Sequence, residues 1–107
     1  FQKYRSYFCF CRGLIMVKVV AEKYIDEKNL DAFMYLAEEM IRLTREEKGC
    51  IEYNIYQDEK DPQHFSYIES WTSREHLERH FESEHFKRLV PQLGELSEAG
   101  PVCIYKE

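Results

Sequence analysis

Two runs of alternating apolar and polar residues, joined by a polar break, make up residues 50–72, CIEYNIYQDEKDPQHFSYIESWT. An alternation with a period of two is the pattern of a half-buried strand. The break contains Pro62 among acidic residues, which is typical of a turn. We therefore predict a β-hairpin whose second strand, residues 64–72, places four side chains on one face: Phe65, Tyr67, Glu69 and Trp71.

The segment before the hairpin predicts one strand and one helix. Residues 16–25, MVKVVAEKYI, alternate and are rich in valine, which indicates a central strand. Asn29 is a suitable N-cap, and apolar residues then recur at helical spacing until Gly49 provides a C-terminal stop. The polar residues fall on the opposite side, so we expect an amphipathic helix that packs on a sheet.

The segment after the hairpin predicts two short helical pieces and a last strand. Ser73 is expected to cap a helix that ends near Phe81, and Ser83 to cap a further helical piece. Gly100 and Pro101 are expected to end that piece, and residues 102–106, VCIYK, to form the final strand.

The resulting order, β-α-β-β-α-β, predicts an α+β protein of the ferredoxin-like, split βαβ type. Its four-stranded antiparallel sheet would carry the helices on one face, with the second and fourth strands at the edges. The other face would be a bare apolar surface, which a second copy of the chain or residues 1–15 would cover. We expect a homodimer, with residues 16–107 as the domain and residues 1–15 as an N-terminal tail outside the core.

Composition excludes several classes of protein. At 107 residues with 44% apolar content, the chain forms one modest domain. A net charge of -5 with interspersed acids and bases argues against a nucleic-acid partner. No run approaches the roughly 18 apolar residues that a membrane span requires. The cysteines fit free thiols, so we expect a soluble, cytoplasmic protein with no membrane partner.

Three of the four histidines lie in residues 76–87, HLERHFESEHFK. His76 and His80 are four residues apart, a spacing that can bind zinc, but no third ligand is placed, so no metal is expected. A predicted helix break separates His80 from His85, so these two need not converge. His80 would end a short helix, where it is either an acid-base group or a hydrogen-bonded junction residue.

Glu69 interrupts the aromatic face of residues 64–72. A carboxylate between Tyr67 and Trp71 must be paired, protonated or in contact with a wet cavity. Pairing with Lys18 or Lys23 on the first strand is one account, and a pocket beside the aromatic residues is the other.

Residues 16–107 resemble the antibiotic biosynthesis monooxygenase domain, a family of small dimeric α+β barrels that includes bacterial quinol monooxygenases. The resemblance rests on weak motifs in a shared order: Glu47-x-Gly49-Cys50, Tyr53, Asp58, Phe65, Glu69-x-Trp71, Leu77-x-x-His80 and Ser83-x-His85-Phe86. It implies a monooxygenase that oxidises a small electron-rich aromatic, of the quinol or phenol type, with dioxygen and without a flavin, a metal or any other cofactor.

The resemblance also implies roles for individual residues. His80 would handle a proton or donate a hydrogen bond, Tyr53 and Trp71 would hold the ring or its oxygens, and Glu69 would orient a partner. These four are the candidate catalytic residues. The candidate substrate-binding residues are Phe33, Phe65, Tyr67, His85 and Phe86.

Three other functions are alternatives to a monooxygenase. Haem degradation is disfavoured, because Val90 and Lys23 stand where that branch of the fold has histidine and asparagine. An isomerase of a small phosphorylated ketone, of the autoinducer-2 breakdown type, would use His80 and His85 and a phosphate contact from Lys87 or Arg88. A non-catalytic dimeric binding or stress module is the third alternative.

Overall fold

The computed structural model describes residues 15–107, so the expected tail lies outside the described residues except for Ile15. The elements follow in the order β1 (Val17–Tyr24), α2 (Glu27–Arg45), β2 (Cys50–Gln57), β3 (His64–Trp71), α3 (Arg74–Phe81), α4 (Glu84–Glu95) and β4 (Glu98–Lys106). This is the predicted order. None of the helices in residues 15–107 is long and apolar enough to cross a membrane.

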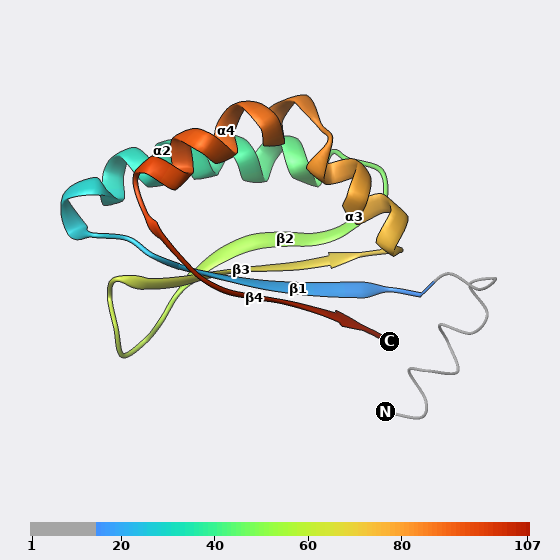
Figure 1. Cartoon of the computed structure of the whole chain (residues 1–107), viewed down its shortest axis with the longest axis horizontal. Helices are drawn as coiled ribbons and strands as arrows, with labels where there is room; N and C mark the ends of the chain where they lie inside the picture. Colours follow the sequence, from blue (N-terminus) through green and yellow to red (C-terminus); the bar gives the residue numbers. More distant parts are fainter. Residues whose placement is uncertain (1–14) are drawn as a thin grey trace.

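The four strands form one antiparallel sheet in the order β2-β3-β1-β4, and all the helices lie on one of its faces (Figure 1). The predicted ferredoxin-like fold is therefore confirmed, with β2 and β4 at the edges. Cys50 and Cys103 lie on these opposite edges, and both are free thiols.

Both short helices begin where serine side chains cap them. Ser73 accepts a hydrogen bond from the backbone N–H of His76, and Ser83 accepts one from the N–H of Phe86. These caps confirm the predicted starts, because each satisfies a backbone donor that has no partner inside the helix. The break between α3 and α4 lets the two helices take different directions.

Three predicted boundaries were wrong. α2 begins at Glu27 because the Asp26 carboxylate, rather than Asn29, accepts from the N–H of Lys28. α4 ends at Glu95, so Gly100 and Pro101 do not end it. β4 begins at Glu98 rather than Val102, and it contains Gly100 and Pro101. A register shift opposite these two residues and the edge position of the strand make the proline tolerable there.

The core lies between the sheet and the helices. α2 buries one side of its surface, formed by Phe33, Ala37, Met40 and Thr44. The helix-facing side of β3 buries Phe65, Tyr67, Glu69 and Trp71, as the alternation predicts. Strict alternation along β2 would place Ile51 on the same side as Tyr53, but Ile51 is exposed because the pairing register of β2 shifts between Cys50 and Glu52. This irregularity leaves Tyr53 opposite Glu69.

The opposite face of the sheet carries apolar and aromatic side chains that no helix of residues 15–107 covers. Val20 and Ile68 are paired at its centre and are half-buried. Tyr24 and Tyr56 are exposed on the same face.

Gly49 makes the tight connection between α2 and β2. Its φ of 88° lies in the left-handed region, and a Cβ built on it would overlap the ring of His76. Only glycine therefore fits where the first residues of α3 pack against this connection. The connection also contains Glu47, whose position matters for the site.

Gly49→Ala is expected to lower the free energy of unfolding by about 2 kcal/mol or more, because it adds left-handed strain and steric overlap. Urea denaturation measures the change. In a His76→Ala background the overlap with the ring is absent. There, Gly49→Ala should cost less unfolding free energy, and the remaining loss should be the backbone strain alone. An effect of Gly49→Ala below about 0.5 kcal/mol would contradict this account.

Candidate functional site

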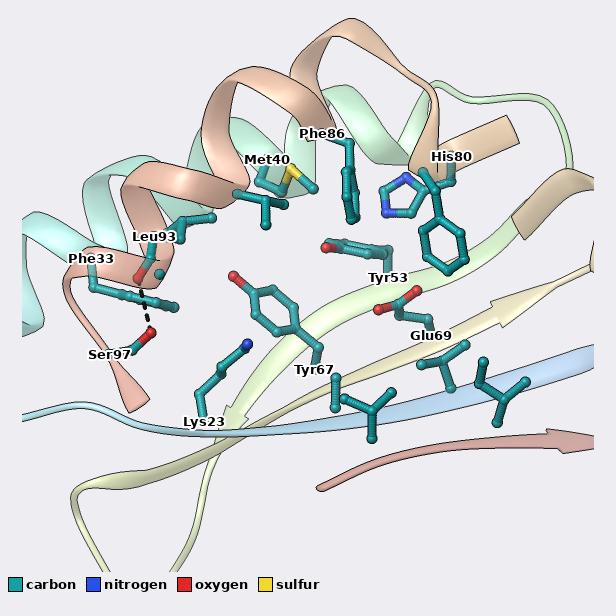
Figure 2. A pocket seen from close by; sticks show the side chains of 17 residues that line it. Lys23, Phe33, Met40, Tyr53, Tyr67, Glu69, His80, Phe86, Leu93 and Ser97 are labelled. Atoms are coloured by element: carbon teal, nitrogen blue, oxygen red, sulfur yellow. Dashed lines mark hydrogen bonds between the residues drawn. The ribbon is translucent and has the colours of Figure 1, made fainter. Parts of the chain in front are cut away.

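A cavity of about 230 Å³ lies between the sheet and the helices α2 and α4 (Figure 2). Most of its wall is apolar or aromatic, from β1, α2, α4 and β4. The polar side chains in the wall are Lys23, Tyr53, Tyr67, Glu69, His80 and Ser97. An apolar cavity with a few polar groups is typical of a small-molecule site, and about 150 Å³ already holds benzene.

His80 lies in the last turn of α3 and is 1% exposed. Its ring is surrounded by aromatic rings, with centroid distances of 4.9 Å to Trp71, 5.0 Å to Phe86 and 5.5 Å to Tyr53. The ring faces the cavity together with Phe86 and Tyr53 (Figure 2). His80 is thus fixed by packing on several sides, as a group needs to be if it is to meet a ligand in one geometry.

Glu47 forms a hydrogen bond with the nitrogen of His80 that does not face the cavity. Its Oε2 accepts hydrogen bonds from His80 Nδ1 at 2.6 Å and from His85 Nε2 at 2.7 Å. A carboxylate only accepts, so the proton of a neutral His80 ring lies on Nδ1 and the lone pair on Nε2. Nε2 makes no hydrogen bond within residues 15–107, which leaves it available to a molecule in the cavity.

Burial lowers the pKa of His80 below its usual 6.5, against the opposing effect of the hydrogen bond to Glu47. The ring is therefore neutral near pH 7 and can accept a proton at Nε2. Glu47 then stabilises the imidazolium that forms. This is the arrangement of a general base with an orienting carboxylate.

Glu69 lies on β3 and is 7% exposed, and its Oε1 accepts a hydrogen bond of 3.0 Å from the indole N–H of Trp71. Burial raises the pKa of Glu69 to about 7. Pairing with Lys18, one of the accounts left open by the sequence, does not occur, because Lys18 lies on the other face of the sheet and pairs with Glu52. Lys23 makes no ion pair with Glu69 either, so the cavity, rather than a salt bridge, accounts for this carboxylate.

Tyr53 and Tyr67 extend the wall from Glu69 along the sheet, with ring centroids 5.5 Å apart. Burial raises the pKa of both phenols, so both stay protonated near neutrality. The hydroxyl of Tyr67 is buried and has no hydrogen-bond partner in the described part of the chain.

Six of the nine candidate residues line the cavity: Phe33, Tyr53, Tyr67, Glu69, His80 and Phe86. Trp71 lies behind Glu69 and His80, and His85 reaches the site through Glu47. Phe65 is buried in the core but is not part of the wall.

Glu47 received no role from sequence reasoning, although the Glu47-x-Gly49-Cys50 junction contains it. Lys23 was considered as a partner of Glu69 but not as a residue that binds a ligand. The predicted helix break left open whether His80 and His85 converge. They do converge on Glu47, which lies 33 residues before His80 and 38 before His85.

Glu47, His80 and His85 also form a set of metal-ligand atoms, which lie within 4.8 Å of one another. One carboxylate and two imidazoles suit a first-row divalent ion such as Zn²⁺. A metal ion would replace both N–H protons, so ligation and the hydrogen-bonded arrangement exclude each other.

A family model described as antibiotic biosynthesis monooxygenase matches residues 16–92. A crystal structure of an antibiotic biosynthesis monooxygenase is 34% identical, with a TM-score of 0.74 over 85% of this chain and 95% of the other. That of a conserved protein of Methanosarcina mazei is 30% identical, with a TM-score of 0.83 over 90% and 96%. An uncharacterised protein of Synechocystis is 32% identical over 77 residues, which are 71% of this chain and 52% of the relative. The chain thus spans about half the length of this curated relative.

Glu69→Gln is expected to stabilise the protein at pH 8 and to have little effect at pH 4. The folded-state pKa of about 7 lies above the ordinary value of 4.5, so folding binds a proton between these values and wild-type stability falls as pH rises through them. The gain at pH 8 should be about 1–3 kcal/mol in urea denaturation. Glu59→Gln, in an exposed turn, is the control. A gain that does not depend on pH would contradict the assignment.

Proposed function

The chain belongs to the antibiotic biosynthesis monooxygenase family, and on that premise we propose that it is a cofactor-independent monooxygenase acting on a small quinol-type aromatic with dioxygen. The observation that carries the proposal is His80, a buried imidazole with a free Nε2 at an aromatic-lined cavity and a carboxylate behind it. The cavity volume of about 230 Å³ suits one substituted ring.

The reaction can proceed without a cofactor because a deprotonated hydroquinone is itself an electron donor to oxygen. His80 Nε2 takes the proton of a ring hydroxyl, and Glu47 stabilises the imidazolium. The phenolate passes one electron to dioxygen, and the resulting radical and superoxide join at a ring carbon. The peroxide takes up the proton from His80.

Cleavage of the O–O bond then releases water and leaves a new carbonyl oxygen on the ring carbon, which loses its hydrogen. A hydroquinone and one dioxygen thus give a hydroxyquinone and one water. One oxygen atom of dioxygen enters the product and the other leaves as water. The aromatic wall around His80 would hold the ring against the base while water is kept out.

The other candidate functions fit the cavity less well. Lys87 and Arg88 lie on the exposed side of α4, where they pair with Glu82, Glu39 and Glu84, so they offer no phosphate contact inside the cavity. A non-catalytic module would not need the buried base and carboxylate. Val90 and Lys23, which replace the histidine and asparagine of the haem-degrading branch, both line the cavity.

Oxygen uptake with a panel of substituted hydroquinones tests the activity. His80→Ala should lower kcat/KM by about 10²–10⁴-fold, because the base is lost. Glu47→Gln should give a smaller loss and move the acid limb of the pH profile to lower pH, since the carboxylate favours the imidazolium. Arg79→Ala, on the same helix but with an exposed side chain outside the cavity wall, is the matched control.

Two further readouts sharpen this test. Labelled dioxygen should place one labelled atom in the product, and dialysis against a chelator should leave the rate unchanged. Equal rates for wild type and His80→Ala, or activity that is lost on chelation and restored by a divalent metal, would contradict the proposal.

We also propose that the chain forms a two-fold dimer through the uncovered face of the sheet. Its centre is the apolar pair Val20 and Ile68, with tyrosines around it, and a surface of this kind is seldom left in water. Analytical ultracentrifugation should give twice the chain mass of 13.0 kDa.

Ile68→Lys should shift this equilibrium to the monomer. Tyr35→Lys changes an exposed aromatic residue on α2 and should not shift it. A wild-type monomer at micromolar concentration would contradict the dimer, as would equal effects of the two variants.

A further inference from the structure

The end of the cavity away from His80 contains an ammonium group. Lys23 is on the helix-facing side of β1, where it is half-buried and lines the cavity. Figure 2 shows Lys23, Phe33, Leu93 and Ser97 at this end, with His80 and Glu69 at the other. Apart from these polar groups, the nearby wall is apolar.

Lys23 has no carboxylate partner among the ion pairs of residues 15–107, whereas Lys18, on the same strand, pairs with Glu52 at 3.4 Å. The hydroxyl of Ser97 donates to the backbone oxygen of Leu93 at 2.9 Å, so its proton is already used. A cation beside an apolar wall loses hydration that only an anion or other acceptors can replace.

Tyr67 gives an independent indication at the same place. Its hydroxyl is buried and unpartnered, so it has a donor and lone pairs to offer to a ligand. β1 and β3 pair Ala21 with Tyr67 and Lys23 with Phe65, which makes Lys23 and Tyr67 diagonal neighbours on one face. The ammonium and the phenol can therefore reach the same small group.

We propose that Lys23 and Tyr67 form an anion subsite, which binds a carboxylate or similar anionic substituent of the aromatic substrate. The ammonium and the phenol would each donate a hydrogen bond to the anion. The aromatic part of this inference rests on the proposed function, while the anion subsite rests on the two side chains.

The geometry defines the class of ligand further. Glu69 on β3 lies opposite Val19 on β1 in the sheet register. Lys23 is four residues after Val19, so about 13 Å separates the two positions along β1 at strand spacing. A ring that presents a hydroxyl to His80 therefore reaches Lys23 with a short acidic arm. Above about pH 7, where Glu69 is ionised, this carboxylate at the opposite end would repel the anion and favour one orientation of the ligand.

Ligand binding measured in the absence of oxygen tests the anion subsite independently of catalytic turnover. The probes are 2,5-dihydroxyphenylacetate and its neutral amide, measured anaerobically by calorimetry and by fluorescence of the single tryptophan, Trp71. Wild type should bind the acid about tenfold or more tightly than the amide, as expected for charge-assisted hydrogen bonds.

Lys23→Met should remove the preference for the acid, and Tyr67→Phe should reduce it. Lys18→Met removes a lysine from the opposite face of the same strand and should keep the preference. Circular dichroism and calorimetry of the amide complex show that each variant is folded. Equal binding of acid and amide by wild type, or a preference that persists in Lys23→Met, would overturn the subsite.

Dihydroxyacetone phosphate distinguishes a phosphate from a carboxylate as the source of the anion. Lys23-dependent binding of this probe, without binding of the aromatic acid, would overturn the aromatic assignment. Lys23-dependent binding of the aromatic acid without oxygen uptake would retain the subsite and contradict the monooxygenase. Oxygen uptake without a Lys23-dependent preference for the acid would support the monooxygenase and contradict the anion subsite.

Discussion

A single carboxylate oxygen connects three parts of the chain at the site. Glu47, in the connection between α2 and β2, accepts hydrogen bonds from His80 at the end of α3 and His85 at the start of α4. The contact fixes which nitrogen of His80 carries the proton and therefore which nitrogen the cavity meets. The left-handed turn at Gly49, packed against His76, helps to place Glu47 where both histidines reach it.

The fold places this contact beside a buried cavity. In the described residues 15–107, helices cover one face of the sheet, and the cavity lies between that face and the helices (Figures 1 and 2). Burial of His80 favours the neutral ring, and burial of Glu69 favours the protonated acid. Burial thus favours the uncharged form of two ionisable side chains in the wall of one cavity, and ionisable groups with pKa values shifted in this way are often found at sites of acid-base chemistry. Lys23 places a positive charge at the far end of the cavity.

Local sequence patterns predicted most of the fold. The alternation in residues 50–57 gives the bounds of β2, and Ser73 and Ser83 cap the helices that they were expected to cap. The irregularity that exposes Ile51 was not predictable from alternation, because it depends on how β2 pairs with β3. Gly100 and Pro101 suggested a loop, yet an edge strand tolerates them.

The site was predictable only in part. The residues that line the cavity from β3 and the end of α3 follow from the aromatic pattern and the family resemblance. The Glu47 contacts bridge 33 and 38 residues, a separation that no local pattern reports. Lys23 could be placed on the helix-facing side of the sheet, but its lack of a carboxylate partner in the described chain appears only when the fold is assembled.

Nitrogen NMR of the histidine side chains tests the central claim most directly, because it reports which ring nitrogen carries the proton. At pH 7, His80 should be neutral, with the proton on Nδ1 and none on Nε2, and Glu47→Gln should weaken that preference. A His80 ring protonated on Nε2 in the wild type, or on both nitrogens, would contradict the account of His80 as a base held by Glu47.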